Sequence, residues 1–144
     1  MSRPRVLVAG TNDAIEALSR ALAGDADILE ARSLKEALAE LERGPFDTIA
    51  CNVRFDESRM FEFLQAVMQH KHGGALRIVA FRADDTALTH STRSAIRNAL
   101  EALGVERFAD LSQLRAEYGD DVALETLRKM VLDETFAPPA PAGN

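Results

Sequence analysis

Five short apolar runs recur along this chain of 144 residues, and each is followed by a stretch with helical periodicity. The runs lie at residues 5–10, 26–31, 46–53, 76–81 and 105–109. A short apolar run between turn signals is typical of a strand that is buried on both faces of a parallel sheet. Strands that alternate with helices form βαβ crossovers, which place helices on both faces of such a sheet. The pattern therefore predicts an α/β protein, a three-layer sandwich around a five-stranded parallel sheet.

The stretches between these runs carry apolar residues on one helical face and capping signals at their ends. Ile15, Leu18 and Leu22 recur on one face, and Asn12 or Asp13 precedes them as a candidate N-cap. Ser33 and Glu36 have the spacing of a capping box at the start of a second helix. We expect the later helices to begin at Glu57 or Ser58, at Ser91 or Thr92, within 110–113 and within 119–121. The third helix is expected to close at Gly73-Gly74.

Composition limits the class of protein and its partners. The net charge of −6 and the pI near 5.1 argue against a nucleic-acid-binding or anionic-membrane surface. The apolar stretch at 6–9 is too short for a signal peptide or a membrane span, so we expect a cytoplasmic protein. The lone Cys51 lies inside an apolar run, which favours a buried thiol in a reducing compartment. One domain is predicted over 1–136, followed by a disordered proline-rich tail at 137–144.

The run at 46–53 is the central strand of the predicted sheet, and Asn52 stands near its carboxyl end. In an open parallel sheet, ligands and chemistry collect at the carboxyl ends of the central strands. A charged loop follows at 54–59. The neutral amide of Asn52 is therefore the first candidate functional group.

Residues 4–135 resemble the receiver domain of response regulators, the CheY-like phospho-acceptor module of bacterial two-component signalling. The resemblance rests on the order and spacing of the elements and on two phrases. These are Phe46-Asp47-Thr48-Ile49 before the central strand end and Phe61-Glu62-Phe63-Leu64 after it. It implies a flavodoxin-like sheet with strand order 2-1-3-4-5.

The phosphorylation positions of the family are all replaced in this chain. The family holds Mg²⁺ with two acidic residues and an acceptor aspartate, because a hard cation prefers charged oxygen ligands. A hydroxyl and a lysine then hold the phosphoryl oxygens. The resemblance puts these five positions on Gly10, Thr11, Asn52, Arg82 and Leu111. A carboxamide is a poor nucleophile, so the resemblance implies a degenerate pseudo-receiver that lacks the phospho-acceptor aspartate.

Two interpretations of these replacements remain open. In the first, Asn52 and Thr11 satisfy loop backbone at strand ends and Arg82 is a solvated arginine. In the second, Arg82 and Arg54 either bind an anion or form an internal lock. The candidate partners for such a lock are Asp56, Asp84 and Asp85.

Other patterns give little sign of catalysis or metal binding. The sequence His70-Lys71-His72 places its histidines about 200° apart on a helix, which suits cations near a helix C-terminus better than a metal site. Gly10-Thr11-Asn12 lacks both nucleotide-binding glycine patterns. No nucleophile with its base and oxyanion donors can be named. We expect neither an enzyme nor a cofactor.

The sequence therefore favours a phosphorylation-independent protein-interaction module in bacterial signal transduction. The resemblance implies a docking or homodimer face on the fourth helix, fifth strand and fifth helix, within 91–103 and 105–130. On that face we single out Arg93, Arg97, Phe108 and Tyr118. The expected partner is a histidine kinase, another regulator or a second copy. The alternative is a flavodoxin-like domain that binds a small ligand, an anion or a nucleotide, at the carboxyl edge of the sheet.

Overall fold

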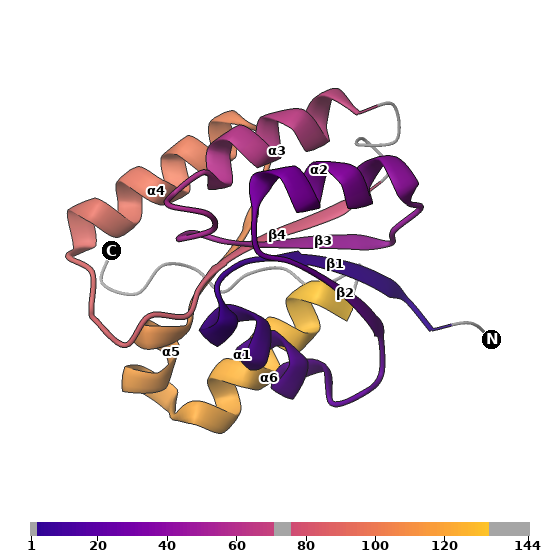
Figure 1. Cartoon of the computed structure of the whole chain (residues 1–144). Coiled ribbons are helices and arrows are strands. Elements are labelled where there is room, and N and C mark those ends of the chain that lie inside the picture. Colours follow the sequence, from indigo (N-terminus) through magenta and orange to yellow (C-terminus); the bar gives the residue numbers. More distant parts are fainter. Residues whose placement is uncertain (1–2, 71–75, 133–144) are drawn as a thin grey trace.

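The computed structural model describes residues 3–70 and 76–132. Its centre is a five-stranded parallel sheet with the order β2-β1-β3-β4-β5, which confirms the predicted fold and strand order (Figure 1). The strands are β1 (Arg5–Ala9), β2 (Asp27–Ala31), β3 (Thr48–Asn52), β4 (Arg77–Arg82) and β5 (Arg107–Asp110). The central strand β3 is buried along its whole length, as its apolar run indicates.

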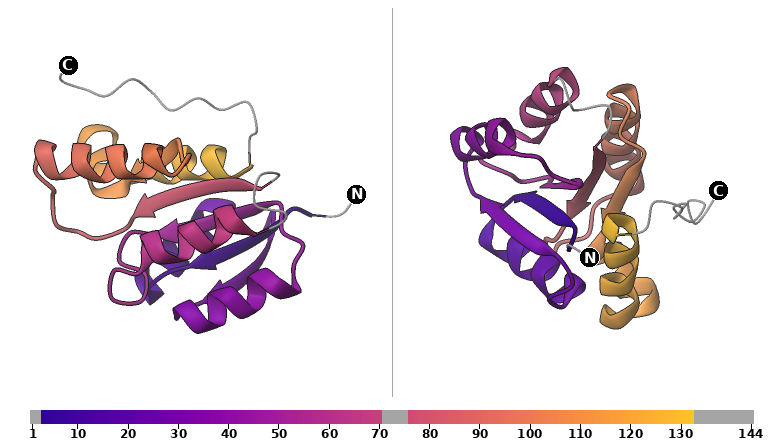
Figure 2. Two further views of the ribbon diagram at one scale, coloured as in Figure 1. Left: turned by 90° about the horizontal axis from the view of Figure 1, so that it is seen from above. Right: turned by 90° about the vertical axis from the view of Figure 1, so that its right-hand side faces the viewer.

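Helices cover both faces of this sheet (Figures 1 and 2). They are α1 (Asn12–Leu22), α2 (Leu34–Arg43), α3 (Met60–Gln69), α4 (His90–Ala102), α5 (Leu111–Tyr118) and α6 (Asp120–Leu132). Helices α2, α3 and α4 bury their apolar faces in one core cluster, and α1, α5 and α6 bury theirs in a second. Because successive strand residues point to opposite faces, Leu7 and Ile49 enter the first cluster while Val8 and Ala50 enter the second.

The helix caps agree only in part with the predictions. Ser33 caps α2, since the backbone N–H of Glu36 donates to Ser33 Oγ at 3.1 Å. The cap predicted for α1 at Asn12 or Asp13 is wrong, because the hydroxyl of Thr11 takes that place and accepts from Ala14 N at 3.4 Å. Thr89 caps α4, so that helix begins at His90, earlier than expected.

The start predicted for α3 at Glu57 or Ser58 is also wrong. Asp56, Glu57 and Ser58 have φ of 43°, 56° and 71°, the left-handed region, so α3 begins only at Met60. The carboxylate of Asp56 accepts from Leu34 N at 2.7 Å and so ties this loop to the start of α2. Helix α3 ends at Gln69, earlier than the expected end at Gly73-Gly74. Gly73-Gly74 and the tail at 137–144 lie outside the described residues.

Candidate functional site

Four of the five predicted pocket positions meet at the carboxyl edge of the sheet, at the left in Figure 1. Gly10 and Thr11 follow β1, Asn52 ends β3 and Arg82 ends β4. The fifth position, Leu111, contributes no polar group to this edge. It is the first residue of α5, and its buried side chain belongs to the core cluster of α1 and α6.

Both polar atoms of the Asn52 carboxamide are bonded to backbone. Its Nδ2 donates to the carbonyl of Phe81 at 3.2 Å, and its Oδ1 accepts from the N–H of Arg54 at 3.2 Å. The side chain is buried, so these bonds replace water. Asn52 thus fastens the strand end to its neighbour and to the following loop, as the first interpretation predicts for this residue.

The positions of the family's acidic pair provide no carboxylate and little room for one. A Cβ atom at Gly10 would lie 3.0 Å from Asn52 Cβ and 3.1 Å from Ala14 Cβ, closer than ordinary carbon contacts. The Thr11 hydroxyl is engaged as the cap of α1. Neither position therefore supplies an anionic ligand of the kind that a hard divalent cation prefers.

Arg82 is buried rather than solvated, which corrects the first interpretation for this residue. It is 3% exposed, and its Nη1 lies 3.2 Å from Asp110 Oδ1. Its Nη2 donates to Thr86 Oγ1 at 2.8 Å and also to the carbonyl of Thr86. A charge buried this deeply requires a partner and hydrogen bonds, and Arg82 has both.

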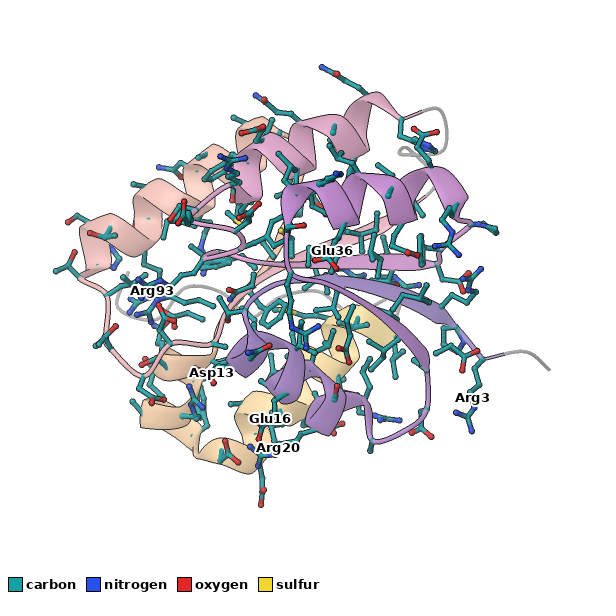
Figure 3. The ribbon with its side chains drawn as sticks, in the orientation of Figure 1. Arg3, Asp13, Glu16, Arg20, Glu36 and Arg93 are labelled. Carbon is teal, nitrogen blue, oxygen red and sulfur yellow. The ribbon has the colours of Figure 1, made fainter. Side chains whose placement is uncertain are left out.

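Asp110 is the partner that the sequence interpretation missed. Parallel pairing places Arg82 opposite Asp110, at the ends of adjacent strands. The other oxygen of Asp110 lies 3.1 Å from Arg93 Nε, and Arg93 reaches this edge from α4 (Figure 3). Asp110 Oδ1 also accepts from the N–H groups of Ser112 and Gln113, which makes it the N-cap of α5. The signal was the strand order itself, because the ends of β4 and β5 are neighbours in a 2-1-3-4-5 sheet.

Arg54 extends this network towards solvent. Its Nη1 lies 3.1 Å from Asp84 Oδ2, and the same oxygen lies 3.8 Å from Arg82 Nη2. We name the resulting series of alternating charges the arginine–aspartate chain. It consists of Arg54, Asp84, Arg82, Asp110 and Arg93.

Of the three lock partners proposed from sequence, only Asp84 belongs to this chain. Asp56 bonds the backbone of α2 instead, and Asp85 lies 3.7 Å from Arg115 Nη2. Within the described residues, no buried side-chain nitrogen or oxygen lacks a hydrogen-bond partner. The pocket is therefore satisfied by its own residues.

A cavity of about 370 Å³ opens beside this pocket, between α1, the loop after β4 and α5. Its charged lining residues are Asp13, Glu16, Arg20, Arg54, Asp84, Asp85 and Arg115. Each arginine is in an ion pair: Arg20 lies 3.1 Å from Asp120, Arg54 pairs with Asp84, and Arg115 pairs with Asp85. Asp13 and Glu16 form no ion pair with any described residue. The uncompensated charge of the cavity is negative, which favours a cationic group over an anion.

The four residues proposed for the interaction face differ in exposure. Phe108 is buried in the core and Arg93 belongs to the arginine–aspartate chain. The guanidinium of Arg97 lies 5.6 Å from the centroid of the Phe108 ring, in cation–π geometry. Only Tyr118 is widely exposed, at 59%. Of the four residues, Arg93, Arg97 and Phe108 thus make internal contacts, whereas Tyr118 is presented to solvent.

The remaining candidate groups show no reactive environment. Burial of Cys51 raises the pKa of its thiol well above the usual range. His70 follows α3 and its Nε2 lies 3.7 Å from a Glu42 carboxylate oxygen. Lys71 and His72 lie outside the described residues. The part of the chain that the structure describes contains no cluster of three or more side chains suited to a metal ion.

The fold is that of the receiver domains of response regulators. It is similar to CheY4 of Vibrio cholerae, with a TM-score of 0.66 and 17% identity, over 91% of this chain and all of that one. It is also similar to the phosphorylated cyanobacterial phytochrome response regulator RcpA, with a TM-score of 0.71 and 15% identity, over 96% of this chain and all of that one. For a response regulator from Hahella chejuensis the TM-score is 0.68 and the identity 17%, over 94% and 99% of the two chains.

The similarity is one of structure alone. No protein-family model matches the sequence, and no curated protein matches it. Among residues 3–70 and 76–132, no helix has the length and apolar character needed to cross a membrane.

Proposed function

We propose that this chain is a pseudo-receiver that acts as a phosphorylation-independent protein-interaction module in bacterial two-component signalling. The observation that carries the proposal is the arginine–aspartate chain, which fills the carboxyl edge with paired charges. The receiver fold supports the signalling context, and the expected partner is a histidine kinase, another regulator or a second copy.

The chemistry of the pocket argues against phosphoryl transfer. The amide of Asn52 has no carboxylate oxygen for attack, and both its polar atoms are already bonded. Gly10 and Thr11 provide no charged ligand for Mg²⁺. Arg82 stands where the family has a small hydroxyl, and its guanidinium is already held by Asp110 and Thr86. No catalytic residue and no cofactor are assigned.

The second candidate is a small-ligand domain, and the cavity beside the pocket is the observation in its favour. An anion or a nucleotide phosphate would meet three arginines that are already paired and two carboxylates that are not. The charge balance therefore makes anion binding the weaker alternative.

A titration with beryllofluoride and Mg²⁺, followed by backbone amide NMR, tests the main proposal. This mimic of an aspartyl phosphate requires an acceptor carboxylate and metal ligands. We expect no shifts at Gly10, Asn52 and Arg82, whereas an ordinary receiver run in parallel shifts at its own pocket. Saturable shifts at those three amides would refute the proposal, as would stoichiometric labelling by a phosphodonor.

The small-ligand alternative has its own test. A thermal-shift screen against nucleotides, phosphates and cyclic dinucleotides detects binding, because a ligand at a hundred times its Kd stabilises the fold by about 2.7 kcal/mol. We expect no shift. A stabilising ligand whose effect is abolished by Arg115→Gln would favour the small-ligand function instead.

A further inference from the structure

The junction between α5 and α6 is an exposed corner of the molecule. Every residue from 116 to 122 is exposed, and Gly119 breaks the helix there with φ of 92°. Tyr118 is 59% exposed and Val122 is 45% exposed. Among the described residues, Met68 is the one other large apolar side chain that is exposed. Tyr118 and Val122 thus present apolar groups to water on either side of this helix break, as candidate anchors for a partner.

The same corner is acidic. Residues 116–127 contain Glu117, Asp120, Asp121 and Glu125 and no lysine or arginine. Asp120 pairs with Arg20 of α1, but Asp121 and Glu125 form no ion pair with a described residue. We name this surface the acidic ridge. It consists of Glu117, Tyr118, Asp121, Val122 and Glu125.

Helix α1 extends the negative charge beyond the ridge. Figure 3 shows Asp13, Glu16 and Arg20 in order along α1, on the side of α5 and α6. Arg20 reaches Asp120 at the junction, so the unpaired Asp13 and Glu16 lie on the helix that borders the ridge. The negative charge on this side of the molecule therefore continues from the ridge onto α1.

The ridge is held in place by the rest of the fold. Helix α6 buries Ala123, Leu127 and Met130 in the core and packs against α1. Arg128 Nη1 donates to the carbonyls of Leu22 at 2.9 Å and Ala21 at 3.4 Å, at the end of α1. Asp110 caps α5 at its other end. A platform fixed in this way loses little conformational entropy on binding.

We propose that the acidic ridge docks a basic amphipathic helix of a partner protein. This inference rests on the proposed interaction function and names the chemistry of the partner. Apolar side chains of that helix cover Tyr118 and Val122, while its lysines or arginines meet Asp121 and Glu125. The charge of the ridge repels nucleic acids and anionic membranes, and its unpaired carboxylates give the bound helix its register.

The test uses the full chain and a labelled 14-residue peptide of leucine and lysine with its leucines on one helical face. Fluorescence anisotropy in about 150 mM salt, where charges beyond ~8 Å are screened, gives its affinity. A peptide of the same composition in scrambled order is the probe control. We expect the amphipathic peptide to bind about tenfold or more tightly than the scrambled one, with amide shifts centred on 116–127.

Surface variants locate the contact. Tyr118→Ser with Val122→Ser should weaken binding by about tenfold or more, because exposed apolar anchors carry much of the energy of an interface. Asp121→Asn with Glu125→Gln should weaken it by several-fold and reduce its salt dependence. Met68→Ser, a matched apolar control on α3, should leave the affinity unchanged. Circular dichroism and the unfolding midpoint verify that each variant is folded.

Three results would overturn the inference. They are equal binding of the two peptides, full affinity in the Tyr118→Ser, Val122→Ser variant, and a concentration-dependent dimer of the free chain that the same variant abolishes. The last would make a second copy the occupant of the ridge. None of these results bears on the beryllofluoride titration, so failure at the ridge remains distinguishable from failure of the proposed pseudo-receiver function.

Discussion

Replacing Asp110 by asparagine tests whether the arginine–aspartate chain stabilises the fold. The amide keeps the shape of the side chain, and asparagine caps helices about as well as aspartate, so α5 keeps its N-cap. What the change removes is the negative charge between Arg82 and Arg93. Arg82, at 3% exposure, would then be buried without a close counter-charge other than Asp84 at 3.8 Å.

The expected loss is large relative to the stability of a domain of this size. Removing one partner from a buried ion pair costs about 3–5 kcal/mol, because the remaining charge stays desolvated. Two features reduce the loss towards the lower limit. Arg93 retains a hydrogen bond to the Leu88 carbonyl at 3.2 Å and is close enough to the surface to reach water, and Arg82 keeps its bonds to Thr86. We therefore expect Asp110→Asn to lower the free energy of unfolding by about 3 kcal/mol.

Urea denaturation followed by circular dichroism measures this loss. With a slope of about 2 kcal/mol per molar urea, the midpoint should fall by about 1.5 M. Asp110→Ala should lose a further ~1 kcal/mol, since it also removes the cap of α5. Asp85→Asn is the matched control, because this carboxylate is fully exposed and should leave the midpoint unchanged.

A change of less than about 0.5 kcal/mol in Asp110→Asn would refute the reasoning, since it is the size expected of an ordinary surface substitution. The double variant Arg82→Met, Asp110→Asn sharpens the test. Removing both buried charges should be less harmful than the two single losses added together, by at least ~1 kcal/mol, because neither charge is left alone. Additive effects would show that the two residues do not act as a pair.

Three further predictions concern the same edge and the loop beside it. Asn52→Asp should destabilise the fold by about 1–3 kcal/mol, because a carboxylate cannot donate to the Phe81 carbonyl, and mass spectrometry after acetyl phosphate treatment should detect no added phosphoryl group. Ser58→Gly should stabilise it by up to ~1 kcal/mol in urea denaturation, since glycine adopts φ of 71° without strain, and a lower midpoint would contradict this account of the loop. Cys51 should react with a thiol reagent at pH 8 only as fast as the chain unfolds, because burial raises the pKa of its thiol and keeps it neutral; prompt stoichiometric labelling of the folded chain would contradict this.

The sheet was predictable because each of its strands corresponds to a local apolar run in the sequence. Each run, with its turn residues, specifies a strand, and alternation with helices specifies parallel pairing. The division of the last helical stretch into α5 and α6 was predictable for the same reason, since Asp110 is a local signal for a helix cap and Gly119 for a helix break. The cap of α1 was not. Thr11, Asn12 and Asp13 are all good caps, and the choice among them depends on where β1 ends.

The contents of the pocket depended on tertiary contacts that no local pattern carries. Arg82 looked solvated because a lone arginine in a polar loop usually is, yet strand pairing places it against Asp110. The left-handed turn at 56–58 was hidden for a similar reason, since Asp56 is held by a hydrogen bond to Leu34, which is distant in sequence. Phe108 was taken for a surface group although its alternation in β5 turns it into the core.

The closed pocket also bears on how such a domain responds to a partner. A conformational switch at this edge would require the loop after β4 to have a second arrangement of accessible energy. Here that loop is fastened by Arg82 through Thr86 and by Arg93 through Leu88, and releasing Arg82 leaves Asp110 partly uncompensated. If releasing Arg82 from Asp110 costs about 3 kcal/mol, the second arrangement of the loop is populated to roughly 0.6%. A partner that requires this second arrangement then binds some 150-fold more weakly than one that binds the resting arrangement. A partner that docks on a surface already formed avoids this loss. The proposed docking surface at Tyr118 therefore suits recognition better than the carboxyl edge, where the charged side chains are already paired.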